Sequence, residues 1–132
     1  MNNKGFTLIE LILVIAILGI LAVSAMPKIF SLTSEAHTAA RDGIGANVNA
    51  GITLAGAKTM AATGIETYPT PLDAVPPNTL CSRINPCFNA VVKDGVTRDW
   101  KKNSDFQYIH LPTNSTYGYD LAGPNKGTFT LQ

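Results

Sequence analysis

An uncharged apolar run near the N-terminus constrains this chain more than any other feature. Residues 11–26 (LILVIAILGILAVSAM) carry no charge and a single hydroxyl, that of Ser24. From Phe6 to Met26 the apolar segment spans about 31 Å as a helix, close to the roughly 30 Å hydrocarbon core of a bilayer. A helix that is apolar on all sides must be buried in lipid or among other copies of itself. We therefore expect a transmembrane or filament-core helix over residues 6–27.

The residues that flank this run are unlike those of an ordinary secretory signal. Such a signal has a small-residue cleavage site after its apolar region, and no Ala-x-Ala pattern follows here. The change in character lies before the run instead, between Gly5 and Phe6. We interpret residues 1–5 as a leader peptide. Lys4 on this flank predicts that the N-terminus stays cytoplasmic and that the later residues are exported.

Glu10 interrupts the apolar segment and does not suit a plain membrane anchor. A carboxylate at this depth costs about 2–3 kcal/mol on insertion scales, and intramembrane charges usually mark function. If the chain is cut after Gly5, Phe6 gains a free amine, and the Phe6 amine of a neighbouring subunit becomes a partner for Glu10. Such a pair would set register and docking. A carboxylate near the membrane surface that snorkels or is protonated explains Glu10 equally well.

The order Lys-Gly followed by Phe-Thr-Leu-Ile-Glu and an apolar run (residues 4–26) resembles the N-terminal signature of type IV prepilins and pseudopilins. The resemblance covers residues 3–30. It implies that a prepilin peptidase cleaves between Gly5 and Phe6, that Phe6 is N-methylated, and that Glu10 contacts the Phe6 amine of a neighbouring subunit. Gly19 and Pro27 also match family positions. Residues 17–28 look most like pilins of the mannose-sensitive haemagglutinin type.

A second helical pattern follows Pro27 and predicts an amphipathic continuation over residues 28–60. Gly19 and Pro27 are soft points, because glycine lowers helix propensity and proline removes a backbone donor. We expect one helix from Phe6 to about Met60, softly interrupted at Pro27. Its small-residue stripe would allow close packing of a sheet. This stripe is formed by Leu32, Ala36, Ala40, Ile44, Val48, Ile52 and Ala55.

Residues 61–132 predict a small globular domain, so that the whole chain is an α+β protein. Residues 63–88 are rich in turn formers, and Cys81 and Cys87 would form a disulfide that closes the 81–87 loop. A zinc site is disfavoured, since neither histidine has ligand spacing to the cysteines. An antiparallel sheet of three or four strands is expected over about 88–132. The strand candidates are residues 88–93, 107–111, 116–121 and 127–131.

Little in the sequence points to catalysis or ligand chemistry. We expect no enzyme activity, cofactor or metal, although four aspartates present an alternative calcium site. The net charge is +1, and acids interleave the basic residues around Trp100, so we expect a solvated loop with one anchored Trp there and no nucleic acid partner. His37 and His110 are interpreted as surface or satisfied histidines, and Asn114 begins a glycosylation sequon. The four aspartates are Asp94, Asp99, Asp105 and Asp120; the basic residues are Lys93, Arg98, Lys101 and Lys102.

These features predict a structural subunit of a type IV pilus-like filament that serves adhesion, attachment or motility. Its expected partners are copies of itself, a prepilin peptidase, the pilus assembly machinery and the inner membrane before assembly. The mature chain would lie in an extracellular filament. A pseudopilin of a type II secretion system, in a periplasmic filament, is the first alternative. A monomeric membrane-anchored binding module is the second.

Overall fold

A computed structural model describes residues 5–132 of the chain. The chain divides into two compact units, one ending at Ala36 and the other comprising His37–Gln132. The helix α1, Leu8–Thr63, contributes residues to both, and the five strands all belong to the second unit. The expected α+β class, with a long apolar N-terminal helix and a small antiparallel sheet, is confirmed.

The predicted interruption at Pro27 is not observed, because helical residues continue on both sides of it. Proline lacks the N–H that would bond the Val23 carbonyl, yet a single missing bond does not end a helix whose neighbouring bonds are intact. Hydroxyl groups nearby bond back to the helix. Ser24 Oγ donates to the carbonyls of Leu21 and Ile20 at 3.0 and 3.1 Å.

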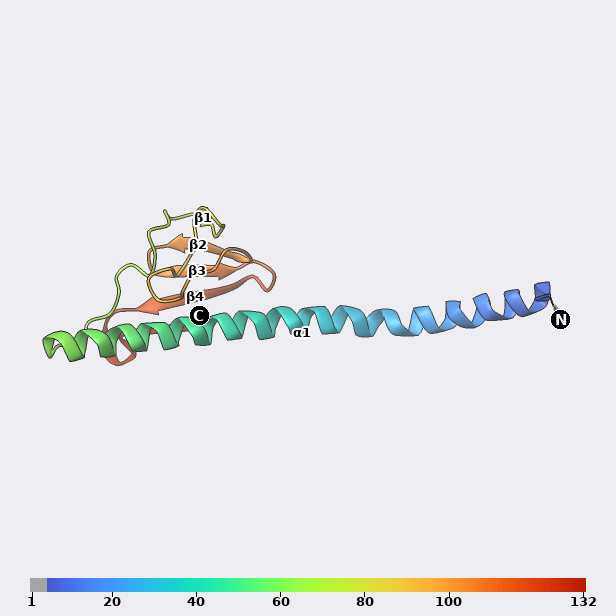
Figure 1. The fold of residues 1–132 in the computed structure, drawn as a ribbon, viewed down its shortest axis with the longest axis horizontal. Coiled ribbons are helices and arrows are strands. Elements are labelled where there is room, and N and C mark those ends of the chain that lie inside the picture. The colour runs from blue at the N-terminus through green and yellow to red at the C-terminus, as the bar shows by residue number, and fades with distance from the viewer. Residues whose placement is uncertain (1–4) are drawn as a thin grey trace. The chain divides into compact units, whose positions relative to one another are not determined.

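The sheet is an antiparallel meander whose strands follow one another in chain order (Figure 1). Each strand pairs with the next along the chain, and the connection from β2 to β3 is a short turn, whereas residues 81–99 separate β1 from β2. Trp100 faces His110 across the β2–β3 pair, and Tyr119 faces Phe129 across the β4–β5 pair. The strands are β1 (Thr79–Leu80), β2 (Trp100–Ser104), β3 (Gln107–His110), β4 (Ser115–Asp120) and β5 (Thr128–Leu131).

The last three strands confirm their predictions, whereas the strand expected at 88–93 is wrong. Phe88 has a φ of 61°, and its carbonyl accepts bonds from Val91 and Val92, so the chain turns there. Its fully buried ring supplies the apolar character that suggested a strand. Sequence reasoning missed β1 and β2, and the sheet therefore has five strands instead of three or four. The loop expected around Trp100 is therefore wrong, since these residues begin β2, whereas the expectation that Trp100 itself is anchored agrees with its burial.

The expected helix stripe packs against the domain only in its later part. Val48 and Ile52 are fully buried, whereas Leu32 and the stripe alanines before Ile44 are exposed. Residues of the domain approach α1 closely at three of its glycines. A Cβ at Gly45 would lie 3.2 Å from Tyr117, one at Gly56 would lie 2.7 Å from Tyr68, and one at Gly51 would clash with the Val91 carbonyl. The rest of the core is Leu72, Val75, Cys81, Cys87, Phe88, Val96, Trp100, Tyr108, Tyr117, Tyr119 and Phe129.

Asn49 of α1 closes one edge of the sheet. Its side-chain amide donates to the Phe129 carbonyl at 2.8 Å, and its Oδ1 accepts the Phe129 N–H at 2.7 Å. Since β5 is the last strand, these two backbone groups face away from β4. The Asn49 amide thus takes the place of a neighbouring strand, and the edge is less available for unwanted pairing.

A buried charge pair fastens the long connection between α1 and β2 to the sheet. Asp73 accepts four hydrogen bonds, from Lys102 Nζ at 3.0 Å, the Val75 N–H at 3.1 Å, the Phe88 N–H at 2.9 Å and the Tyr108 hydroxyl at 2.8 Å. Burial raises the pKa of Tyr108, and the Asp73 charge adds to this shift. The expectation that Lys102 is a solvated surface charge is wrong.

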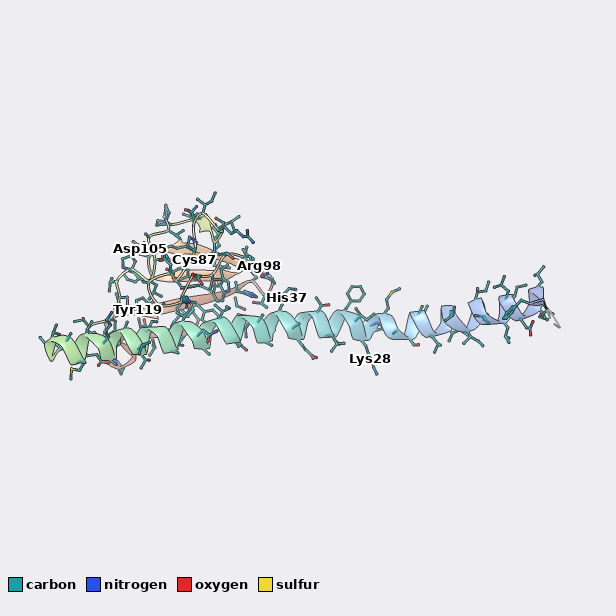
Figure 2. The ribbon with its side chains drawn as sticks, in the orientation of Figure 1. Lys28, His37, Cys87, Arg98, Asp105 and Tyr119 are labelled. Atoms are coloured by element: carbon teal, nitrogen blue, oxygen red, sulfur yellow. A yellow bond between two sulfur atoms is a disulfide. The ribbon has the colours of Figure 1, made fainter. Side chains whose placement is uncertain are left out.

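The predicted disulfide between Cys81 and Cys87 is confirmed, with Cα atoms 5.4 Å apart. Within the loop that it closes, the Ser82 N–H donates to the Asn85 carbonyl, and the Asn85 N–H donates to Ser82 Oγ. Cys87 exchanges two backbone hydrogen bonds with Val96. Closing so short a loop contributes about 2–3 kcal/mol on the chain-entropy model. Figure 2 labels Cys87 in the second unit, where its side chain is fully buried.

Candidate assembly site at the N-terminus

The first turn of α1 is fixed by a reciprocal set of hydrogen bonds between Thr7 and Glu10. The Glu10 N–H donates to Thr7 Oγ1 at 3.3 Å. In return, the Thr7 N–H and hydroxyl donate to Glu10 Oε2 at 2.8 and 2.7 Å. This is a capping box, in which the residue before the helix and the third helical residue satisfy each other's backbone donors. The helix therefore begins at Leu8 for a definite chemical reason.

Glu10 consequently has a partner within its own chain. A single chain already offers this carboxylate two donors, since both the N–H and the hydroxyl of Thr7 donate to it. The sequence contained the signal, because Thr7-Leu8-Ile9-Glu10 has the spacing of a capping box directly before an apolar run. Glu10 is still unusual for an apolar segment, and its capping role explains its position without explaining why an acid is tolerated there.

The expected cleavage position lies just outside the helix. Gly5, Phe6 and Thr7 precede the first helical residue and are exposed, with Phe6 at 77%. Residues 1–4, which include Lys4 and most of the expected leader, lie outside the described residues. A peptide bond before a capped helix is free of helical hydrogen bonds, which suits the access that proteolysis requires.

Beyond the cap, α1 presents apolar side chains around its whole circumference. Figure 2 shows them extending outward from the first part of the helix. Ile9 is 75% exposed and Ile20 is 72% exposed in this single chain, and no residue of the most apolar stretch is buried. Among the described residues, α1 is long and apolar enough to cross a membrane. Such a surface needs lipid or protein to cover it.

Gly19 and Pro27, the expected soft points, lie within this apolar surface. A Cβ at Gly19 would meet nothing within 4 Å, so the single chain gives no steric reason for glycine there. Pro27 lies inside the continuous helix. Neither position makes a contact that explains its residue type, and we therefore keep both as hypotheses about a change in helix shape.

The second unit carries no comparable chemical constellation in its described part. No three His, Cys, Asp or Glu side chains there come together in a way that could hold a metal ion. His110 is 2% exposed, bonds Thr113 through Nδ1 at 2.8 Å, and has its pKa lowered by burial, as a satisfied histidine would. An open groove of about 510 Å³ runs between α1 and the 92–99 loop. Its lining includes the apolar residues Ile44, Val96 and Trp100.

Comparison with known proteins gives this N-terminus a class. A model of the prokaryotic N-terminal methylation motif matches residues 1–26, which include the capped start of α1, Glu10 and the whole apolar run. The chain is therefore a carrier of this motif. The match ends before the second unit and says nothing about the sheet.

A curated relative provides a second and longer similarity. The type IV narrow pilus major component PilA5 of Thermus thermophilus is 45% identical over 67 residues, which cover 51% of this chain and 55% of the relative. The chain thus spans about half the length of the curated relative that it matches. No solved structure matches the chain significantly. The chain thus carries the methylation motif and is similar, over about half of its length, to a type IV pilus component.

Proposed function

We propose that the protein is a structural subunit of a type IV pilus-like filament. It is inserted in the inner membrane as a prepilin, cleaved after Gly5 by a prepilin peptidase and N-methylated at Phe6. The observation that carries this proposal is the apolar surface of α1, exposed on all sides in the single chain and headed by Glu10. Lipid covers such a surface before assembly, and copies of the same helix would cover it in a filament. The second unit would then form the filament surface.

The pairing of Glu10 with the Phe6 amine of a neighbouring subunit belongs to the same proposal. Two opposite charges about 4 Å apart attract strongly in a low-dielectric core, and leaving one of them unpaired there is costly. The Phe6 amine exists only after cleavage. This pairing would therefore admit mature subunits to the filament in preference to precursors.

The relative named above favours a pilus over a type II secretion pseudopilus, because it is a major component of a type IV narrow pilus. Electron microscopy of sheared surface filaments, with mass spectrometry of their main subunit, tests the choice. We expect long extracellular filaments and a mature mass that starts at methylated Phe6. Short filaments confined to the periplasm would indicate the pseudopilus. A mature chain that stays monomeric in the membrane would indicate the anchored binding module.

The role of Glu10 is tested by Glu10→Ala. We expect normal membrane insertion and loss of most filament, since the neighbouring amine then lacks its partner. Glu35→Ala is the matched control, because Glu35 is an exposed acid on the same helix. Normal filament yield from Glu10→Ala would contradict the assembly role of this residue.

A further inference from the structure

Asp73 and Lys102 bring a carboxyl group and an amine together inside the second unit. Lys102 Nζ lies 3.0 Å from Asp73 Oδ1, and both side chains are buried. The Tyr108 ring, whose centroid is 6.0 Å from Lys102 Nζ, packs on the Phe88 ring at a centroid distance of 4.3 Å. Because ionised groups are costly in such an apolar site, the neutral pair formed by moving one proton from the amine to the carboxylate is accessible there.

The two oxygens of the Asp73 carboxyl group have different surroundings. Oδ2 accepts bonds from the Phe88 N–H at 2.9 Å and the Tyr108 hydroxyl at 2.8 Å. Oδ1 faces Lys102 Nζ and accepts the Val75 N–H at 3.1 Å. Two donors on one oxygen stabilise the negative charge that develops there when a nucleophile adds to the carboxyl carbon. Burial raises the pKa of the Tyr108 hydroxyl, which therefore stays protonated and keeps its role as a donor.

A second carboxylate contacts the same amine. Asp105 Oδ1 is 3.3 Å from Lys102 Nζ, and the Asp105 side chain is 57% exposed. Asp105 lies between β2 and β3, and it connects the buried pair with solvent. A carboxylate so close to a nucleophilic amine can accept its proton and later return that proton to a leaving group.

We propose that Lys102 and Asp73 form an intramolecular amide bond, which joins β2 covalently to the connection that follows α1. Lys102 first passes one proton to Asp73 Oδ1, which gives a neutral amine and a carboxylic acid. Lys102 Nζ then adds to the Asp73 carboxyl carbon, and the negative charge moves to Oδ2 between its two donors. Asp105 accepts the proton that Nζ loses and returns it to Oδ1, whose bond to carbon breaks as water leaves. One N–C bond forms, one C–O bond breaks, and no oxidant or co-reactant is needed.

The amide would add a second covalent link to the one made by the disulfide. Asp73 and Lys102 are 29 residues apart, and the disulfide between Cys81 and Cys87 lies within the loop that they would close. The connection after α1 could then not be pulled away from the sheet while the amide is intact. This inference concerns the second unit alone and does not depend on the proposed filament function.

The mass of the full chain measures the bond directly, because its formation removes one water molecule. The comparison is with the mass of the processed sequence with its disulfide. After reduction, trypsin should give a branched peptide that joins residues 59–83 to residues 102–126. A chain without the amide is also cut after Lys102 and releases residues 103–126 separately. An ion pair and an amide both hold this contact together, so mass, and not stability, distinguishes them.

We expect most of the wild-type chain to be lighter by one water and to give the branched peptide. Lys102→Met should restore the full mass. Asp105→Asn keeps the size of an exposed side chain and removes the proton acceptor. General acid–base catalysis contributes about 10²–10⁴-fold, so Asp105→Asn should lower the cross-linked fraction by about tenfold or more. Asp94→Asn, which changes an exposed acid in another turn, is the matched control and should match the wild type.

Two results would overturn the amide bond. A wild-type chain of full mass that releases residues 103–126 would show that the contact is an ion pair only. A chain lighter by one water that yields no branched peptide would place the dehydration elsewhere. Equal cross-linked fractions in Asp105→Asn and Asp94→Asn would remove Asp105 from the reaction, provided that Trp100 fluorescence shows both variants to be folded.

Discussion

The ammonium group of Lys102 lies 3.0 Å from the carboxylate of Asp73, and both side chains are buried. Their contact joins β2 to the connection that follows α1. Removing one member of such a pair typically costs about 3–5 kcal/mol, because the other charge stays buried without its counterion. Lys102→Met should therefore lower the free energy of unfolding by this amount, although Asp73 keeps its other three donors.

Urea unfolding of the detergent-solubilised chain, followed by the fluorescence of buried Trp100, measures this change. Lys101→Met is the matched control, since Lys101 is a half-buried neighbour on the same strand and should change stability by less than about 0.5 kcal/mol. Equal effects of the two variants would show that the buried pair contributes nothing specific.

Asn49 should be the most important polar residue of α1 in the second unit. Asn49→Ala removes both bonds to the main chain of Phe129, each with a net contribution of about 0.5–1.5 kcal/mol, so a loss of about 1–3 kcal/mol is expected. Asn47→Ala makes the same change of helix propensity at an exposed position and should be close to neutral. The same urea unfolding compares them, and a loss no larger than that of Asn47→Ala would refute edge closure by Asn49.

Acid should destabilise the second unit through His110. Burial lowers the pKa of His110, partly offset by the nearby Asp99 carboxylate, so the folded state favours the neutral ring. The unfolded state then binds more protons, and stability falls as the pH drops through the unfolded value of about 6.5. His110→Gln should flatten the pH dependence of the urea midpoint between about pH 7 and 5. An unchanged slope of the urea midpoint against pH would mean that groups other than His110 cause the pH dependence.

The sequence revealed the helix, the disulfide and three strands because each has a local signature. The apolar run, the paired cysteines and the alternation around Tyr108 and Phe129 are visible within a few residues. The capping box is equally local, because Thr7 and Glu10 stand three residues apart directly before the apolar run.

The missed features depend on contacts between residues far apart in the chain. Lys102 lies among other charged residues, so the sequence suggests that its side chain is solvated. In the structure the side chain is buried and donates to Asp73, 29 residues earlier in the chain. The pairing of Asn49 with Phe129 spans 80 residues. Phe88 suggested a strand since a buried aromatic side chain is common in strands, while only its surroundings show that the backbone turns there. Periodicity indicates that a residue is buried, and not which partner buries it.

Two glycines of the same helix should respond in opposite ways to alanine. At Gly43 a Cβ would meet nothing within 4 Å, so Gly43→Ala should gain about 1 kcal/mol from helix propensity. At Gly51 the new Cβ would run into the carbonyl of Val91, a backbone group that cannot rotate away. Gly51→Ala should therefore lose stability by about 1–3 kcal/mol despite the same gain in propensity. If the urea midpoints of both variants moved in the same direction, the Val91 carbonyl would not be packed against Gly51 of α1.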